Sequence, residues 1–374
     1  MKVRAAVLHA MGAVSPYAIS RPLRIEDVDL APPGYGEVRV AIKAAGLCHS
    51  DLSVINGDRP RPMPMVLGHE AAGVVDALGP GVNDLAVGDH VVMVFMPSCG
   101  HCQPCAVGRP ALCEPGAVAN GAGTLLSGER RWRHMGAAVN HHLGVSAFAE
   151  MAVMSRRSLV KIDRDLPFAQ AALFGCAVLT GVGAVVNTAK VPAGASVAVV
   201  GLGGVGLSSV LGAIAAGASR VVAIDLAEDK LQLAKSLGAS DVFNAGSAEV
   251  AEAVRSATGG GCEFVFEMAG SAKAMELAYK ITRRGGTTVT AGLPPPQATM
   301  ALPLVNLVAE ERTVKGSYIG TAVPSRDIPR FIEMFRNGKL PVDRLLSGTF
   351  ALDQINEGFD QLAAGMAVRQ VVLM

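Results

Sequence analysis

Residues 196–225 read SVAVVGLGGVGLSSVLGAIAAGASRVVAID, and this stretch decides the fold class. Its first five residues form a short β-branched run of the kind found in buried parallel strands. A glycine-rich segment follows, and the apolar, alanine-rich residues after it predict a helix that ends near Gly217. A second apolar run at 220–224 predicts a neighbouring strand that closes with Asp225. The order strand, glycine loop, helix and strand indicates an α/β fold with a doubly wound parallel sheet.

The glycine-rich segment, GLGGVG at 201–206, matches the G-x-G-x-x-G fingerprint of dinucleotide binding. Its glycines allow a tight turn, close approach of a pyrophosphate and close packing of helix on strand, while the helix N-terminus offers free N–H groups. An acidic residue about 20 positions further on accepts the ribose hydroxyls, and its charge repels a 2′-phosphate, so the sequence favours NAD over NADP. The predicted dinucleotide contacts are Gly201, Gly203, Gly204, Val205, Gly206, Asp225 and, at the adenosine ribose, Lys230.

Four cysteines lie close together upstream of this motif, in CGHCQPCAVGRPALC at 99–113. Zinc takes four thiolates tetrahedrally, and the intervening glycines and prolines supply the turns that such a lobe needs. Free buried thiols and a disulfide pair are the alternatives. We interpret Cys99, Cys102, Cys105 and Cys113 as ligands of a closed, structural zinc, which leaves no ligand position open for a substrate.

The other three cysteines lie far apart in the sequence. Cys48 belongs to GLCHSD, Cys176 belongs to ALFGCAVLTG, and a GHE motif with His69 lies between them. Two cysteines and one histidine are a known ligand set for a catalytic zinc with an open fourth position. Cys262 has no assigned role and is expected to be a buried hydrophobe.

These motifs together resemble those of the zinc-dependent alcohol dehydrogenases of the medium-chain dehydrogenase/reductase superfamily. The resemblance extends over essentially the full length, and it includes CHSD at 48–51, GHE at 68–70, the four-cysteine lobe and the GLGGVG loop. It implies a Rossmann domain together with a GroES-like, mainly β catalytic domain built from both chain ends. It also implies two zinc ions per chain, NAD as cofactor, and a small alcohol or aldehyde as substrate.

The resemblance assigns roles around the catalytic zinc. It makes Cys48, His69 and Cys176 the zinc ligands, Asp51 the partner that fixes the tautomer of His69, and Glu70 a carboxylate that visits the zinc during ligand exchange. Ser50 becomes the first link of the path by which the proton leaves. The remaining assignments are cofactor contacts for His49, Thr180 and Arg369 and a substrate pocket lined by Phe95 and His142.

The chain departs from the best-known animal members at two positions. Ser53 stands where those proteins end the proton path with a histidine, and serine cannot act as a base near neutral pH. His49 stands where many relatives carry an arginine on the pyrophosphate, so we expect weaker retention of the dinucleotide.

The motifs set the expected domain boundaries. Residues 1–178 form the GroES-like catalytic domain, with the structural zinc lobe at 97–115. Residues 179–319 form the Rossmann domain, and residues 320–374 return to the catalytic domain.

Composition narrows the functional classes. The net charge is +1 over 374 residues, which leaves no electrostatic footprint for nucleic acid or an anionic membrane. Two uncharged stretches, 166–189 and 191–219, are long enough to span a bilayer, but glycines and polar residues interrupt both. Six cysteines with proposed zinc roles indicate a reducing, cytoplasmic setting. Relatives are dimers or tetramers, so we expect a homo-oligomer.

Two other functions remain open at this point. A formaldehyde dehydrogenase that depends on glutathione or mycothiol is the enzymatic alternative, although the anion-binding arginine of the glutathione enzymes would fall near Ala117. A redox-sensing or structural protein that has kept the fold without turnover is the non-enzymatic one. Primary or aromatic alcohols are the favoured substrates.

Overall fold

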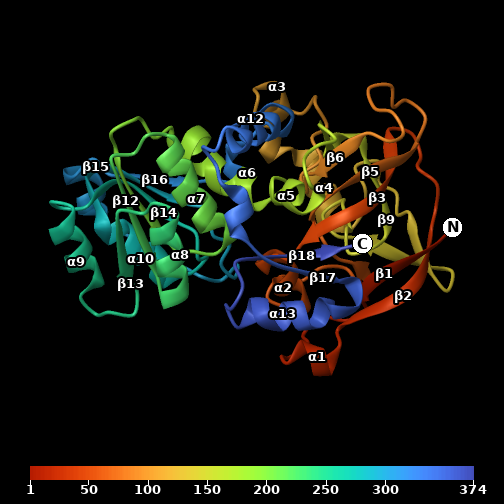
Figure 1. Cartoon of the computed structure of the whole chain (residues 1–374), viewed down its shortest axis with the longest axis horizontal. Helices are drawn as coiled ribbons and strands as arrows, with labels where there is room; N and C mark the ends of the chain where they lie inside the picture. The colour runs from red at the N-terminus through yellow and green to blue at the C-terminus, as the bar shows by residue number, and fades with distance from the viewer. The chain divides into compact units, whose positions relative to one another are not determined.

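The computed structural model describes residues 1–374 and divides the chain into two compact units (Figure 1). The first unit consists of Met1–Cys176, Val323–Pro329 and Leu346–Met374, and the second of Ala177–Ala322 and Arg330–Leu345. Both chain ends therefore contribute to the first unit.

Residues 320–374 were all expected in the catalytic domain, but the compact units of the structure place Arg330–Leu345 in the second unit. The division falls inside helix α12 (Pro324–Arg336). After this helix, the side chain of Arg344 donates hydrogen bonds to the backbone oxygen and the hydroxyl of Ser236. These contacts attach the segment to the second unit. They join residues 108 positions apart, and no local sequence pattern predicts them.

Two sheets form the core of the first unit. One is a closed barrel with the strand order β1 (Lys2–Leu8), β2 (Leu23–Leu30), β7 (Trp132–His134), β8 (Ala137–His141), β4 (Met65–Val66). The other has the order β10 (Leu159–Ile162), β6 (His90–Met93), β5 (Glu70–Leu78), β3 (Glu37–Gly46), β18 (Arg369–Leu373), β17 (Leu346–Ala351), with β9 (Met151–Ser155) also paired to β3. Along β3 the apolar residues Val38, Val40 and Ile42 alternate with more exposed ones and are buried, as expected for a strand with one face in the core.

Short helices connect these strands. They are α1 (Tyr17–Ser20), α2 (His49–Ile55), α3 (Gln103–Ala106), α4 (Glu114–Ala122), α5 (Phe168–Leu173) and α13 (Ile355–Ala363), with 3₁₀ turns at Pro110–Leu112, Arg156–Ser158 and Leu352–Gln354. Helix α2 starts directly after Cys48, which is its N-cap residue.

The second unit contains a six-stranded sheet in which all paired strands are parallel. Its order is β13 (Asp241–Asn244), β12 (Arg220–Asp225), β11 (Ser196–Val200), β14 (Cys262–Glu267), β15 (Thr282–Thr290), β16 (Thr313–Gly316). The helical segments are α6 (Ala177–Gly183), a π-helical turn at Ala184–Ala189, α7 (Gly204–Ala215), α8 (Glu228–Ser236), α9 (Val250–Ala257), α10 (Ala272–Ile281) and α11 (Leu304–Ala309), with 3₁₀ turns at Ile319–Thr321 and Val342–Leu345. The strand order reverses direction next to β11, which confirms the predicted doubly wound sheet.

The long uncharged stretches lie inside these elements. In β11 the side chains of Val197, Ala198 and Val199 are completely buried, as expected for a strand covered on both faces. The stretch 166–189 is divided among α5, α6 and the π-helical turn, and 191–219 forms β11, a loop and α7. No helix of the structure combines the length and the apolar composition that crossing a bilayer requires.

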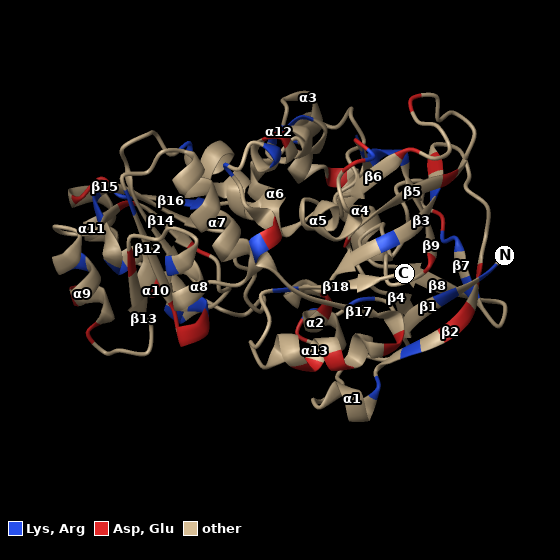
Figure 2. Ribbon diagram, viewed as in Figure 1, with Lys and Arg blue, Asp and Glu red and all other residues tan.

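Charged residues of both signs are interspersed over the elements of each unit (Figure 2). This distribution agrees with the net charge of +1. The absence of a nucleic-acid partner stays a prediction.

Candidate active site

The structure brings the three separated ligand candidates of the first unit together. The sulfur atoms of Cys48 and Cys176 and a ring nitrogen of His69 lie within 4.8 Å of one another. All three residues are buried, and Nε2 of His69 lies 3.5 Å from Sγ of Cys176. Sequence motifs up to 128 residues apart therefore form one site.

Strand pairing explains why Cys48 and His69 meet. Strands β3 and β5 are antiparallel, and Gly46 pairs with Glu70, so the residues just beyond the strand ends lie side by side. The backbone at Gly68 has a φ of +93°, and a Cβ there would lie 2.6 Å from the backbone nitrogen of Phe148. Only glycine fits this position, which turns the chain so that His69 enters the site.

The chemistry of this donor set fits a zinc ion. The two cysteines are free thiols rather than a disulfide. A hydrogen bond with Cys176 is the main cause that lowers the pKa of Cys48 well below its ordinary value, and the neighbouring His69 acts in the same direction. A buried thiolate with a second sulfur and an imidazole beside it matches the ligand set of a catalytic zinc, with one position left open.

A buried carboxylate fixes the orientation of the histidine. Asp51 lies in α2 and is completely buried, and its Oδ2 is 3.0 Å from Nδ1 of His69. The backbone N–H of Gly68 donates to Oδ1 of the same carboxylate at 3.0 Å. With a proton on Nδ1, the Nε2 lone pair of His69 faces the sulfur atoms, as a metal ligand requires.

Glu70 and Arg369 form a second buried pair close to Cys48. Nη1 of Arg369 lies 3.4 Å from Oε2 of Glu70 and donates a hydrogen bond of 2.9 Å to the backbone oxygen of Leu47. Burial raises the pKa of Glu70 to about 7, although the arginine opposes this shift. The structure thus places Arg369 in the first unit, engaged with Glu70, and its predicted contact with a pyrophosphate stays a prediction.

The four clustered cysteines also converge. Their sulfur atoms lie within 4.8 Å of one another, and all four are free thiols. Backbone N–H groups point at the sulfurs: that of Cys102 donates to Cys99 at 3.2 Å, and those of Cys99 and Gly116 donate to Cys113 at 3.1 and 3.4 Å. Such donors stabilise thiolates, so the lobe fits a closed zinc site.

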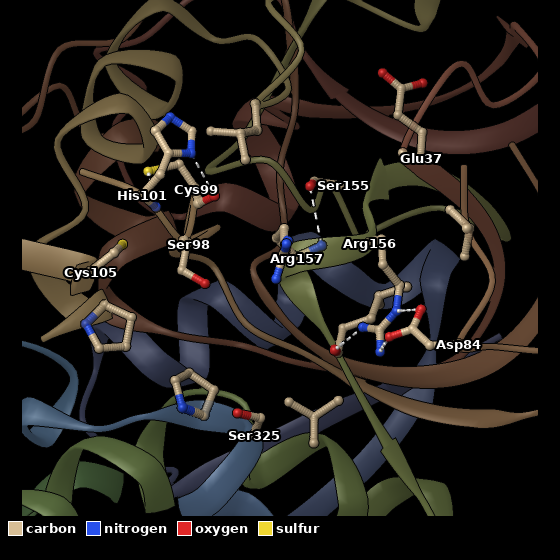
Figure 3. Close-up of a pocket in the computed structure, with 18 of the residues that line it drawn as sticks. Glu37, Asp84, Ser98, Cys99, His101, Cys105, Ser155, Arg156, Arg157 and Ser325 are labelled. Carbon is tan, nitrogen blue, oxygen red and sulfur yellow. Dashed lines mark hydrogen bonds and ion pairs between the residues drawn. The ribbon is translucent and has the colours of Figure 1, made fainter. Parts of the chain in front are cut away.

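A cavity lies beside this lobe (Figure 3). It does not include the site formed by Cys48, His69 and Cys176, which we call the three-donor site. Cys99 and Cys105 lie in its wall, whereas none of the three donors lines it. Across the cavity, Arg156 holds Asp84 through two hydrogen bonds of 2.7 and 2.8 Å. Because Cys48, His69 and Cys176 are not in its wall, this cavity is not a candidate for the chemistry.

The glycine loop of the second unit has the predicted local geometry. Gly201 has a φ of +92°, and α7 begins at Gly204. A Cβ on Gly206 would lie 1.8 Å from the backbone oxygen of Gly201, whereas a Cβ on Gly203 would meet nothing within 4 Å. The third glycine of the motif therefore allows helix and strand to pack, and the second leaves space above the loop.

Asp225 ends β12 and faces this loop. Its carboxylate accepts the backbone N–H of Leu202 at 2.6 Å and that of Ala227 at 2.9 Å. The carboxylate is thus anchored beside the loop, where the fingerprint expects the ribose hydroxyls. Lys230 lies in the first turn of α8 and is partly exposed, and Thr180 is buried in α6.

The other predicted residues lie in the first unit. His49 and Ser50 form the first turn of α2, the former exposed and the latter partly exposed. Ser53 donates its hydroxyl proton to the backbone oxygen of His49 at 2.8 Å. The ring of Phe95 is buried and stands edge-on to His69, with ring centroids 5.3 Å apart.

One contact of the site was not predicted from the sequence. His142, predicted only as a pocket residue, places its Nδ1 3.0 Å from Oδ1 of Asp51. The two residues are 91 positions apart, and no spacing motif links them.

Comparisons with known proteins agree with this geometry. Residues 34–164 match the family model of the alcohol dehydrogenase GroES-like domain, and residues 204–337 match that of the zinc-binding dehydrogenases. The chain is 34% identical to an alcohol dehydrogenase zinc-binding domain protein from Burkholderia ambifaria, with a TM-score of 0.94 over 100% of this chain and 99% of the other. It is 32% identical to the benzyl alcohol dehydrogenase from Acinetobacter calcoaceticus, with a TM-score of 0.93 and the same coverage. A structure from Sinorhizobium meliloti 1021, bound to NADP, is 26% identical with a TM-score of 0.81, covering 100% of both chains.

Proposed function

Because the chain belongs to the zinc-type alcohol dehydrogenases of the medium-chain dehydrogenase/reductase superfamily, we propose that it is a zinc-dependent, NAD-linked enzyme that interconverts primary or aromatic alcohols and their aldehydes. The observation that carries this proposal is the convergence of Cys48, His69 and Cys176 in one buried site.

The residues of the site have distinct tasks. Cys48, His69 and Cys176 would hold the catalytic zinc. When bound, zinc supplies a Lewis acid that polarises an alcohol or carbonyl oxygen, and the nicotinamide supplies the site that accepts or gives hydride. Asp51 keeps the proton of His69 on Nδ1, so that Nε2 remains available as a ligand.

Ser50 moves the proton that the alcohol loses. Its hydroxyl lies two residues after Cys48 and is partly exposed to solvent. A proton passed to this hydroxyl can therefore reach water without a further side chain. The hydroxyl of Ser53 takes no part in this route, because it donates its proton to the backbone oxygen of His49.

The preference for NAD rests on Asp225. Two backbone N–H groups fix its carboxylate beside the glycine loop. A negative charge held there accepts ribose hydroxyls and repels a 2′-phosphate. The protein from S. meliloti binds NADP, so the cofactor must be measured for this chain.

Two observations support a preference for aromatic or primary alcohols: the position of Phe95, and the similarity of the chain to a benzyl alcohol dehydrogenase. The buried ring of Phe95 lies beside the ligand His69, which places an apolar surface next to the reacting group. A protein 32% identical to this chain is a benzyl alcohol dehydrogenase. Nδ1 of His142 lies 3.0 Å from Oδ1 of Asp51, so this nitrogen faces the carboxylate rather than a substrate.

The cellular setting follows from the thiols. All seven cysteines are free in the structure, and six of them belong to the two converging groups. Oxidation would compete with metal ligation at these thiols, which supports a reducing, cytoplasmic compartment. We also infer a homodimer or homotetramer, which light scattering of the purified protein would test.

The experiment is a panel of alcohols and aldehydes assayed with NAD and with NADP. We expect benzyl alcohol and medium-length primary alcohols to reduce NAD with a kcat/KM well above that for NADP. A formaldehyde arm, with and without glutathione or mycothiol, tests the thiol-dependent alternative. Turnover restricted to formaldehyde plus thiol would replace our proposal with that alternative, and the absence of all turnover in protein holding two zinc ions would contradict both.

A further inference from the structure

The carboxylate of Asp51 contacts two imidazoles rather than one. Its Oδ2 lies 3.0 Å from Nδ1 of His69, and its Oδ1 lies 3.0 Å from Nδ1 of His142. The rings of His69 and His142 stand at 86° to each other with centroids 5.6 Å apart. All three side chains are at most 1% exposed. The result is a dry His–Asp–His cluster directly behind the three-donor site.

The protons in this cluster are determined by its burial. A buried carboxylate needs donors on both oxygens, and here Oδ1 receives the Gly68 N–H and faces His142. The proton of neutral His142 therefore belongs on Nδ1, the ring nitrogen that lies 3.0 Å from Oδ1 of Asp51. His142 thus holds one end of the carboxylate while the other end holds His69.

A tight turn fixes the backbone of His142. It follows β8, and its N–H donates to the hydroxyl of Ser146 at 2.9 Å, while its carbonyl accepts the N–H groups of Val145 and Ser146 at 3.0 and 3.3 Å. Leu143 and Ser146 adopt positive φ angles of 51° and 55°. Non-glycine residues rarely adopt this conformation, so the surrounding structure holds the turn in place.

We propose that His142 is a positioning residue of the metal centre: it fixes the Asp51 carboxylate, which in turn orients His69 toward the zinc. This inference rests on the proposed function, because it takes Cys48, His69 and Cys176 to be zinc ligands. A role limited to filling core volume predicts that any side chain of similar size suffices at position 142. A positioning role requires a hydrogen-bond donor there.

A matched pair of variants separates these two roles. His142→Asn keeps an N–H donor near the place of Nδ1, and His142→Leu removes the donor at nearly the same volume. His141→Gln is the control: His141 is the adjacent buried histidine, its Nε2 accepts the N–H of Arg131 at 3.0 Å, and glutamine keeps an acceptor there. His142→Met, which also lacks a donor, replaces the leucine variant if the latter does not fold.

Two measurements on the zinc-loaded protein read out the effect. The first is the rate at which a chromophoric chelator removes each zinc ion, with the four-cysteine lobe as internal reference. The second is the visible absorption spectrum after cobalt replaces the catalytic zinc, because this spectrum reports ligand geometry directly. Thermal unfolding and kcat are recorded alongside.

We expect H142L to release the zinc held by Cys48, His69 and Cys176, here called the inner zinc, roughly 10- to 100-fold faster than wild type. We also expect H142L to shift the cobalt spectrum. H142N and H141Q should remain within about threefold of wild type. Wild-type release and spectrum in H142L would overturn the inference, and so would equal losses in H142N and H142L, since volume would then matter rather than the donor. The failure of the proposed function looks different: wild type itself would then hold no inner zinc or oxidise no alcohol.

Discussion

Two single alanine substitutions in the glycine loop should have opposite consequences. At Gly206 a Cβ would lie 1.8 Å from the backbone oxygen of Gly201, about 1.2 Å inside the 3.0 Å limit for such contacts. At Gly203, three residues earlier, a Cβ would meet nothing within 4 Å, and the φ of −68° suits alanine. The protein itself therefore tolerates a methyl group at Gly203 and not at Gly206.

The geometry gives the size of each effect. The atom that a methyl group at position 206 meets is backbone, which cannot rotate away, so G206A should cost about 3 kcal/mol of folding free energy, the upper end for overpacking. For a domain of this size that corresponds to a melting temperature about 6–12 °C lower. G203A changes a helix N-cap from glycine to alanine, which costs at most about 1 kcal/mol. Its methyl group would occupy the space into which a pyrophosphate must move, and we expect an NAD dissociation constant roughly 10- to 100-fold higher.

Thermal unfolding and NADH fluorescence titration of the two variants test this reasoning. We expect G203A to stay folded and to bind NADH weakly, and we expect G206A to be destabilised. Tight NADH binding by G203A would refute the placement of the pyrophosphate on this loop. A G206A variant as stable as wild type would refute the loop geometry itself.

Three further predictions concern other parts of the chain. Replacing Asp225 with serine keeps an acceptor for the Ala227 N–H but removes the charge that repels a 2′-phosphate, so the ratio of kcat/KM for NADP to that for NAD should rise roughly 10- to 100-fold in steady-state assays. Replacing Cys105 with serine should release the lobe zinc and lower the melting temperature while the inner zinc remains, as metal analysis of the folded fraction would show. Burial, assisted by the two neighbouring arginines, lowers the pKa of His141 to about 3, so its neutral form stabilises the fold fully above pH 6.5 and progressively less as the pH falls toward 3. In denaturant titrations between pH 7 and pH 5, wild type should therefore lose about 2 kcal/mol more stability than H141Q, and equal losses would contradict the shifted pKa.

The parts of this protein that were predictable from sequence are those determined by interactions between residues close together in the chain. The strand, glycine loop, helix and acidic residue at 196–225 lie within 30 residues, and hydrophobic pattern and backbone freedom determine them. The four-cysteine lobe was predictable for the same reason, because short loops bring its sulfur atoms close together. In both places the structure shows the predicted local geometry.

The three-donor site could not be derived from spacing alone. Cys48, His69 and Cys176 meet through the pairing of β3 with β5 and the approach of the segment after α5, and their assignment needed a resemblance to known proteins. The contact between Asp51 and His142 escaped even that. The attachment of Arg330–Leu345 to the second unit was missed because it depends on long-range contacts such as that between Arg344 and Ser236. Tertiary contacts of this kind leave no periodicity in a single sequence.

The most direct test of the account is diffraction from crystals of the purified protein at the zinc absorption edge, with alcohol oxidation measured on the same preparation. We expect two anomalous peaks per chain, one among the lobe cysteines and one bonded to Cys48, His69 and Cys176. In C176S we expect the second peak and alcohol oxidation to be lost together. Full activity in protein that lacks density between those three side chains would contradict it.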